Sequence, residues 1–118
     1  MIKREDIFEY AEKTYDAKPD YPFRNYLHYA VLRHSDDDKW LGLVMNVPRN
    51  RLGLEGDGDV DVLDIKCHPA KVDDLKNKPG FRPAYHMNKE HWLTVILDGS
   101  VSPDAVFALL DESYELTK

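Results

Sequence analysis

The sequence has very little of what marks secreted, membrane-spanning or disulfide-linked proteins. Cys67 is the one cysteine among 118 residues, which excludes an internal disulfide framework and fits a reducing cytoplasm. No apolar run approaches the ~20 residues of a membrane span. The charged stretch 1–13 lacks the apolar core of a signal peptide. We therefore expect a cytoplasmic chain with a single domain over residues 1–118, no membrane partner, and enough length to build its own core.

Motifs for metals and nucleotides are also missing. The chain contains no CxxC, HExxH, GxGxxG or GxxxxGK[ST] pattern. Residues 57–68, DGDVDVLDIKCH, suggest a calcium loop, but an EF-hand needs glycine at its sixth position and glutamate at its twelfth. Those positions hold Val62 and His68. We interpret this stretch as a glycine-bearing turn that leads into a strand, with Asp59 and Asp61 facing water.

No catalytic set can be assembled from the sequence. Cys67 and His68 are neighbours in a predicted strand, where successive side chains point to opposite faces, so they cannot act as nucleophile and base. His86 and His91 are five residues apart, which matches neither the helical nor the strand spacing of metal ligands. We therefore expect no catalytic residue, no metal site and no cofactor, and we interpret the chain as a non-enzymatic binding domain.

The charge is acidic overall and unevenly distributed. The formal net charge is −6, which disfavours a polyanionic partner unless the charges are segregated. Residues 55–64 hold five acids and no base, whereas residues 66–91 hold six Lys or Arg against three acids. The second segment is a modest basic patch and is the part of the chain best suited to contact phosphate.

Apolar periodicity predicts helices at both ends of the chain. Ile7, Phe8, Ala11 and Tyr15 lie on one face of a helix over residues 3–16. Ser102 is an N-cap residue and Pro103 follows at the first helical position, so a second long helix begins there. A short helix is expected within residues 69–78.

Runs of aromatic and β-branched residues predict four strands, over residues 25–34, 39–47, 60–68 and 93–99, with Trp92 as an alternative start of the last. The short turn 35–38 makes the first two strands an antiparallel hairpin. In the second strand, alternation places one set of side chains on a single face: Leu41, Leu43, Met45 and Val47. The order of elements predicts an α+β fold, an antiparallel sheet with helices packed mainly on one face.

The face of this sheet opposite the helices has two interpretations. Alternation places Trp40, Asn46 and Lys66 there, opposite Leu41, Leu43, Ile65 and Cys67, and Trp92 can join them. An open aromatic and basic face of this kind stacks bases in some sheet modules. Alternatively, the two tryptophans cover a small second core together with the loops.

Several blocks of the sequence together resemble one known family. They are Arg33-His34 and Lys39-Trp40, then IKCHP at 65–69, PGFRPAYHMNKEHW at 79–92 and ESYEL at 112–116. In order and spacing they resemble the YjbR/MmcQ family over almost the whole chain. The resemblance implies a CyaY-like fold, in which helices from both termini pack on one face of an antiparallel sheet. The family motif falls on Lys66, Pro83, Tyr85, Asn88, Lys89, His91, Trp92, Ser113 and Tyr114.

The resemblance also implies a partner, because the family is described as predicted DNA-binding "double wing" proteins. On this hypothesis the basic side chains, including Lys71, contact phosphate, and Tyr85 or Trp92 stacks on a base. The candidate binding residues are Lys66, Arg82, Tyr85, Asn88, Lys89, His91 and Trp92.

Two alternatives to DNA binding stay open. The same face can bind a protein or a small ligand with no nucleic acid. Frataxin-like relatives of the fold bind iron through acidic residues, and the corresponding carboxylates here would be those of Glu5, Asp6, Glu9, Glu12 and residues 36–38.

Overall fold

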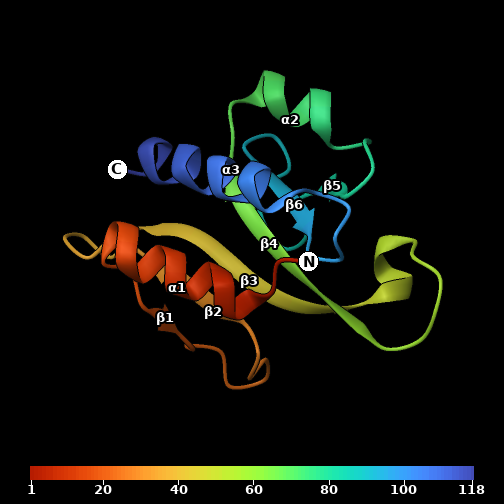
Figure 1. Ribbon diagram of the computed structural model, residues 1–118, viewed down its shortest axis with the longest axis horizontal. Helices are drawn as coiled ribbons and strands as arrows, with labels where there is room; N and C mark the ends of the chain where they lie inside the picture. Colours follow the sequence, from red (N-terminus) through yellow and green to blue (C-terminus); the bar gives the residue numbers. More distant parts are fainter.

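A six-stranded antiparallel sheet forms the centre of the computed structural model, which describes residues 1–118 (Figure 1). The strand order is β1-β2-β3-β4-β6-β5. The elements in chain order are α1 (Arg4–Tyr15), β1 (Pro19–Asp20), β2 (Ala30–Arg33), β3 (Trp40–Pro48), the 3₁₀ turn η1 (Arg49–Leu52), β4 (Asp59–Lys66), α2 (Pro69–Leu75), β5 (Phe81–Pro83), β6 (Trp92–Ile96) and α3 (Pro103–Leu116).

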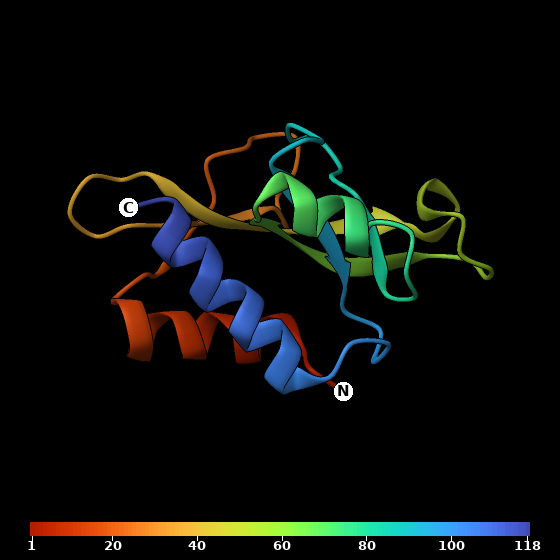
Figure 2. The same ribbon diagram turned by 90° about the horizontal axis from the view of Figure 1, so that it is seen from above.

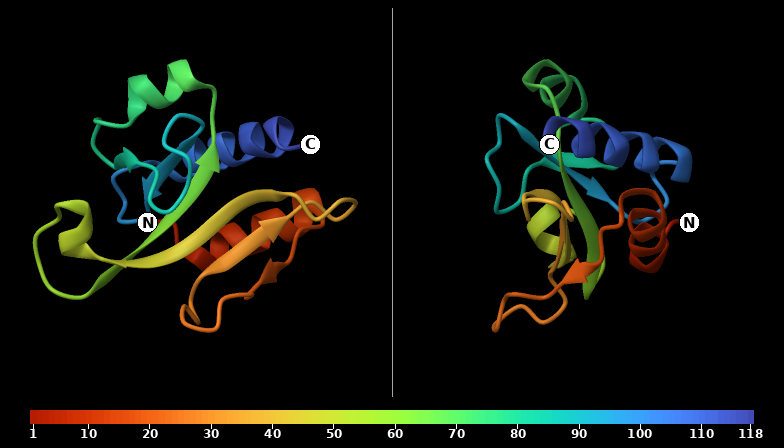
Figure 3. Two further views of the ribbon diagram at one scale, coloured as in Figure 1. Left: turned by 180° about the vertical axis from the view of Figure 1, so that it is seen from behind. Right: turned by 90° about the vertical axis from the view of Figure 1, so that its left-hand side faces the viewer.

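Helices cover one face of the sheet and loops cover the other. Figure 2 shows α1 and α3 side by side beneath the sheet, with the connections before β2 and before β6 above it. The right-hand view of Figure 3 shows the same two connections on the side away from α1 and α3. We call the side covered by residues 21–29, 49–54 and 84–91 the loop face. None of the helices is long and apolar enough to cross a bilayer.

The larger hydrophobic core lies between the sheet and the terminal helices. The predicted helix stripes supply it, because Ile7, Ala11 and Tyr15 of α1 are buried, as are Val106, Leu109, Leu110 and Ser113 of α3. They pack against Leu63, Ile65, Leu93 and Val95 from β4 and β6. The Ser102 side chain accepts a hydrogen bond from the Ala105 backbone N–H at 3.2 Å, as expected of an N-cap.

A second core of nine buried residues lies under the loop face. Its members are Tyr29, Val31, Leu43, Met45, Val47, Leu52, Val60, Val62 and Ile96. Trp40 packs against this cluster together with Phe23, Leu54, Tyr85 and Met87. The second-core interpretation is therefore confirmed for Trp40. Trp92 is half-buried and is not part of the cluster.

Two short strands were not predicted, and one predicted strand is shorter than expected. β1 and β5 extend the sheet from four strands to six at its two edges. The run 25–34 is a strand only over Ala30–Arg33, since residues 25–29 form turns in which the amides of Tyr26 and Tyr29 donate to the carbonyls of Phe23 and Tyr26. The aromatic residues favoured a strand by propensity, but here they reach over the sheet and cover its second face.

A β-bulge in β3 separates Leu41 from Leu43, Met45 and Val47, which were predicted to share its face. Leu32 pairs with Gly42 and Arg33 pairs with Trp40, so Leu41 is the extra residue in β3. Leu41 consequently joins the helix-side core, whereas Leu43, Met45 and Val47 face the second core. The prediction that these four side chains share one face, and that Leu43 faces the helices, was wrong.

Two polar contacts link the sheet to the terminal helices, one at Asp61 of β4 and one at His34, which follows β2. Asp61 was expected to face water, but it forms a two-pronged ion pair with Arg4 of α1, with both N–O distances at 2.9 Å. Buried His34 bonds Thr117 through its Nε2 at 2.7 Å and stacks on Tyr114. These contacts hold both terminal helices to the sheet.

Ser113 supplies the most buried of these links. Its hydroxyl accepts a hydrogen bond from the Lys66 backbone N–H at 2.9 Å and donates one to the Leu41 carbonyl at 2.6 Å. Leu41 and Lys66 lie just beyond the last β3–β4 pair, Leu43 with Asp64, and a small hydroxyl on α3 bonds both of these backbone groups. The Ser113-Tyr114 pair in the sequence therefore has a structural reason.

We predict that Ser113→Ala, which removes only one hydroxyl group, destabilises the fold strongly because two backbone groups lose their hydrogen-bond partner. Each buried backbone group left without a partner costs roughly 1–3 kcal/mol, so urea unfolding should show a free-energy loss in that range or above. Ser35→Ala, at an exposed position in the β2–β3 turn, is the matched control. Equal stabilities of the two variants would contradict the bridging role of Ser113.

Candidate binding face

The loop before β6 is held in shape by two of the predicted binding residues. The Asn88 side-chain oxygen accepts hydrogen bonds from the N–H groups of Glu90 and His91, at 2.9 and 3.1 Å. The Lys89 ammonium donates to the Ala84 carbonyl at 2.6 Å. Asn88 also accepts from the Trp92 N–H through its backbone carbonyl. Asn88 and Lys89 therefore close this loop, and both oxygens of Asn88 and the ammonium group of Lys89 are engaged within it.

Asp64 lies fully buried beneath the same loop. The Thr94 hydroxyl donates to one Asp64 carboxylate oxygen at 2.5 Å and accepts from the Tyr85 N–H at 2.9 Å. The other carboxylate oxygen, Oδ2, has no hydrogen-bond partner. Burial raises the pKa of Asp64 to about 8, against the lowering effects of the Thr94 hydrogen bond and the Lys89 charge. The loop is thus anchored to β6 and β4 by a carboxyl group that is largely protonated at neutral pH.

Aromatic rings from two loops meet above this anchor. Tyr26 stacks on Tyr29, with ring centroids 4.5 Å apart and planes 21° apart. Phe23 contacts both Tyr29 and Trp40 edge-on, each at 6.1 Å. From the other loop, His86 approaches Tyr29 at 6.1 Å and Tyr26 at 6.4 Å. His86 has a φ of 67°, a left-handed conformation that is uncommon outside glycine.

Two hollows adjoin the group formed by Tyr26, Tyr29 and His86. The first, of about 310 Å³, is lined mainly by apolar side chains: Phe23, Tyr26, Tyr29, Trp40, Leu43, His86 and Met87. The second, of about 480 Å³, is more polar; Tyr26, Tyr29 and His86 also line it, and Arg51, Tyr85 and Asp59 are added. The three shared residues form the ridge between the hollows.

The structure brings only part of the predicted residue set together. Lys66 and Trp92 are cross-strand partners, and Arg82 pairs with Thr94 on the next strand. Alternation from the helix-facing residues Ile65, Phe81 and Leu93 places Lys66, Arg82 and Trp92 on the loop face. His91, just before β6, is exposed, and its backbone carbonyl accepts a hydrogen bond from the Cys67 N–H.

Few of these predicted side chains are free to contact a partner. Arg82 donates through Nε to the Leu52 carbonyl at 2.8 Å and through a terminal nitrogen to the Phe81 carbonyl. The side chain of Lys66, by contrast, has no partner; the one hydrogen bond of this residue to another side chain is made by its backbone. Lys71, outside the set, is paired with Glu112 of α3 at 3.0 Å.

Charge is segregated between the two sides of the sheet. Helices α1 and α3 carry eight carboxylates and two basic side chains, a net −6 that equals the formal net charge of the whole chain. The loops 21–29, 49–54 and 84–91 hold four basic residues against one acid. Lys66 and Arg82 of the sheet add two positive charges to this face, and Asp59, which lines the polar hollow, adds one acid. The loop face is therefore basic although the net charge of the whole chain is negative.

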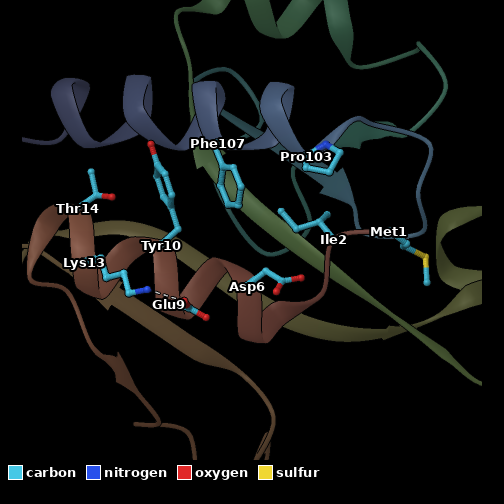
Figure 4. Close-up of a pocket in the computed structure, with 9 residues that line it drawn as sticks. All are labelled: Met1, Ile2, Asp6, Glu9, Tyr10, Lys13, Thr14, Pro103 and Phe107. Atoms are coloured by element: carbon cyan, nitrogen blue, oxygen red, sulfur yellow. Dashed lines mark hydrogen bonds and ion pairs between the residues drawn. The ribbon is translucent and has the colours of Figure 1, made fainter.

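Another groove lies between α1 and α3 (Figure 4). It measures about 470 Å³, and the stacked rings of Tyr10 and Phe107 form one wall, with centroids 4.2 Å apart. Glu9 at its rim is paired with Lys13 at 2.7 Å. Asp6 accepts from the Lys3 N–H. The carboxylates of this helix layer were the candidates for a frataxin-like metal site, but no three His, Cys, Asp or Glu side chains gather where they could hold one ion.

Cys67 has the environment of a core residue rather than of a reactive thiol. Cys67 is buried in the helix-side core, and burial raises the pKa of its thiol to about 11. His68 is exposed at the start of α2. The prediction that these neighbours do not form a nucleophile–base pair agrees with this geometry.

Sequence reasoning missed the residues that shape the loop face: Phe23, Tyr26, Tyr29, Arg51, Asp64 and His86. Tyr26 and Tyr29 fell in the run 25–34 that was predicted to be a strand, Phe23 lay in the break before it, and Asp64 was counted only as one of the five acids of residues 55–64. One signal was available for Asp64. In strand alternation it shares a face with Val60 and Val62, so it follows two apolar side chains toward a buried surface.

We predict that Asp64→Asn changes the pH dependence of stability. The pKa of Asp64 is raised in the folded state from 3.8 to about 8, so the folded state holds this proton more tightly than the unfolded chain. The resulting stabilisation is complete below about pH 4 and is lost as the pH rises through about 8. Asparagine cannot titrate, so its urea-unfolding free energy should lack this decline, which approaches ~1.4 kcal/mol per pH unit inside the window.

The comparison that isolates this effect is the difference between the wild type and the variant, since other groups titrate in both. Asp57→Asn, at an exposed position, is the matched control and should follow the wild type. Parallel curves for wild type and Asp64→Asn would mean that Asp64 stays ionised in the folded protein.

Comparison with known proteins links the chain to relatives without an assigned role. The family model described as YjbR matches residues 12–116. The uncharacterized protein YyaQ of Bacillus subtilis (strain 168) is 43% identical over 118 residues, which is 100% of both chains. The uncharacterized protein YjbR of Escherichia coli (strain K12) is 50% identical over 52 residues, 43% of this chain and 44% of that one.

Solved structures share the architecture as well. A crystal structure of a protein from Pseudomonas syringae has a TM-score of 0.94 at 47% identity, covering 99% of this chain and 100% of that one. Deinococcus radiodurans protein DR2400, with a DUF419 domain, has a TM-score of 0.74 at 24% identity over 98% of this chain and 78% of that one, which is a likeness of fold alone. The predicted α+β fold and the family resemblance are both confirmed, and the chain belongs to the YjbR family.

Proposed function

We propose that this protein is a non-enzymatic, cytoplasmic nucleic-acid-binding domain that contacts phosphates through its loop face. The segregation of charge is the observation that carries the proposal. The helix layer holds the whole acidic excess, and the opposite side of the sheet is basic and aromatic. A basic face of this kind supplies the phosphate contacts that dominate affinity for nucleic acids.

Three cations on this face are unpaired within the chain. The side chains of Arg24, Arg51 and Lys66 form no hydrogen bond or ion pair, whereas Arg82 and Lys89 are bonded to carbonyl groups. Binding phosphate through the first three would break no existing contact. We therefore assign the phosphate contacts to Arg24, Arg51 and Lys66, and we assign to Arg82, Asn88 and Lys89 the role of shaping the loops.

The chemistry around the site supports a binding role without catalysis. The Cys67 thiol is buried on the far side of the sheet, and the raised pKa of Asp64 reflects burial rather than a catalytic partner. Tyr85 and His86 lie near each other, at a centroid distance of 4.1 Å, but they line a hollow with no nucleophile beside them. DNA is the partner that the family resemblance implies, and the proposal covers both single strands and duplexes.

We predict that binding to short DNA weakens steeply as salt rises and depends on these three cations. Each phosphate contact contributes about one unit to the slope of log K against log salt. Arg51→Ala and Lys66→Ala should each lower the slope by about one, as measured by fluorescence anisotropy of labelled oligonucleotides. Lys13→Ala, in the acidic helix layer, is the control and should leave the slope unchanged. Absence of binding at low salt, or an equal effect of Lys13→Ala, would refute the proposal.

A protein partner is the second candidate, and one observation favours it. Leu27, with 73% of its surface exposed, lines the polar hollow together with the half-exposed Tyr26. Large apolar side chains exposed in this way mark protein contact sites. Leu27→Asp should then abolish a cross-linked partner complex in cell extract that Lys66→Ala preserves. Loss of the complex in Lys66→Ala alone would favour nucleic acid instead.

A further inference from the structure

The exposed apolar surface of the molecule is concentrated in one loop. Four large hydrophobic residues are strongly exposed, and three of them, Tyr21, Tyr26 and Leu27, belong to residues 21–27. Exposed aromatic groups gathered in this way, beside unpaired cations, mark a contact surface rather than random surface composition. The loop lies on the basic side of the sheet (Figures 2 and 3).

Tyr26 differs from the other two because it continues a stack. Its ring lies on Tyr29 at 4.5 Å, and Tyr29 is buried with only 8% of its surface exposed. Tyr26 itself is 50% exposed. Since one face of the Tyr26 ring is covered by Tyr29, its exposed area lies on the other face and the ring edge. The loop therefore presents an open aromatic face at the end of a built stack.

The base of this stack is fixed in place. Tyr29 is contacted edge-on by Phe23, and the His86 ring approaches it from the second loop, with the Tyr85 ring 4.1 Å from His86. The Tyr85 backbone is tied through Thr94 to buried Asp64. A platform held from two sides loses little conformational entropy when a planar ligand lies on it.

The hollow next to Tyr26 has the size and lining for one planar ring. Its volume of about 310 Å³ is at the lower end of the roughly 300–1,000 Å³ typical of small-molecule sites. Its walls include the rings of Phe23, Trp40 and His86. On the other side of Tyr26, the polar hollow contains Arg51, and Arg24 stands two residues before Tyr26 in the chain. Aromatic faces flanked by cations are the arrangement that binds single strands, where bases stack and phosphates pair.

We propose that Tyr26 stacks on one unpaired nucleobase and that the loop face consequently selects single-stranded over duplex nucleic acid. The inference rests on the proposed nucleic-acid function and names the form of its ligand. A base in a duplex already stacks on its neighbours, so a duplex can offer phosphates to Arg24 and Arg51 but no free ring to Tyr26. The single strand gains the additional aromatic contact.

The test compares one labelled oligonucleotide, alone and annealed to its complement, at a single low salt concentration. Wild-type protein should bind the single strand more tightly. Tyr26→Ala should weaken single-strand binding by about 5- to 150-fold, the range for loss of one base–aromatic stack. It should leave duplex binding within about twofold. Tyr26→Phe should keep single-strand affinity, because the ring is retained.

Tyr21→Ala is the matched control, since Tyr21 is an exposed aromatic residue of the same loop that lines neither hollow. Urea unfolding of each variant checks that the fold is kept. If Tyr26→Ala weakens both ligands equally, or neither, while Arg51→Ala weakens both, the phosphate-binding function stands and the stacking role is overturned. If wild-type protein binds neither ligand, the proposed function itself fails and the stacking role fails with it.

Discussion

A sheet with apolar residues on both faces must be covered on both, and this chain has long helices for only one. Strand β4 makes the constraint plain, because Leu63 and Ile65 point toward α1 and α3 whereas Val62 and Asp64 point the other way. The second face is covered by loops rich in aromatic side chains. The remaining features of the molecule follow from how those loops are held.

Loops cover a sheet well only if their backbone groups have partners, and here polar side chains supply them. Asn88 and Lys89 close the loop before β6, and the Asp64–Thr94 pair ties the amide of Tyr85 to the sheet. Burial of the Asp64 carboxyl is tolerated because its raised pKa keeps it largely neutral. The residues of the PAYHMNKEHW block are therefore the means by which the loop face keeps one shape, which leaves Tyr26, Arg24, Arg51 and Lys66 as its outward-facing groups.

Much of the fold could be predicted from the sequence, and the errors have physical causes. Periodicity located α1 to within one residue at each end, and the Ser102-Pro103 signal gave the start of α3. The two- and three-residue strands β1 and β5 carry too little pattern to be recognised, since they exist through pairing with β2 and β6. Leu41 was correctly assigned to the helix side, but Leu43 was assigned to the wrong face because a bulge is a property of two paired strands, not of one. The candidate site was only partly predictable for the same reason: Lys66 and Trp92 are brought together by register, and Tyr26 meets His86 only when two loops cross over the sheet.

The central claim is that the loop face, and not the acidic helix layer, is the binding surface. The most direct measurement is a map of backbone amide chemical-shift changes by NMR as a short single-stranded oligonucleotide is added. We expect the changes to gather in residues 23–29, 49–54 and 85–91 and at Lys66. Changes confined to α1 and α3 around the Tyr10–Phe107 groove, or no changes anywhere, would contradict it.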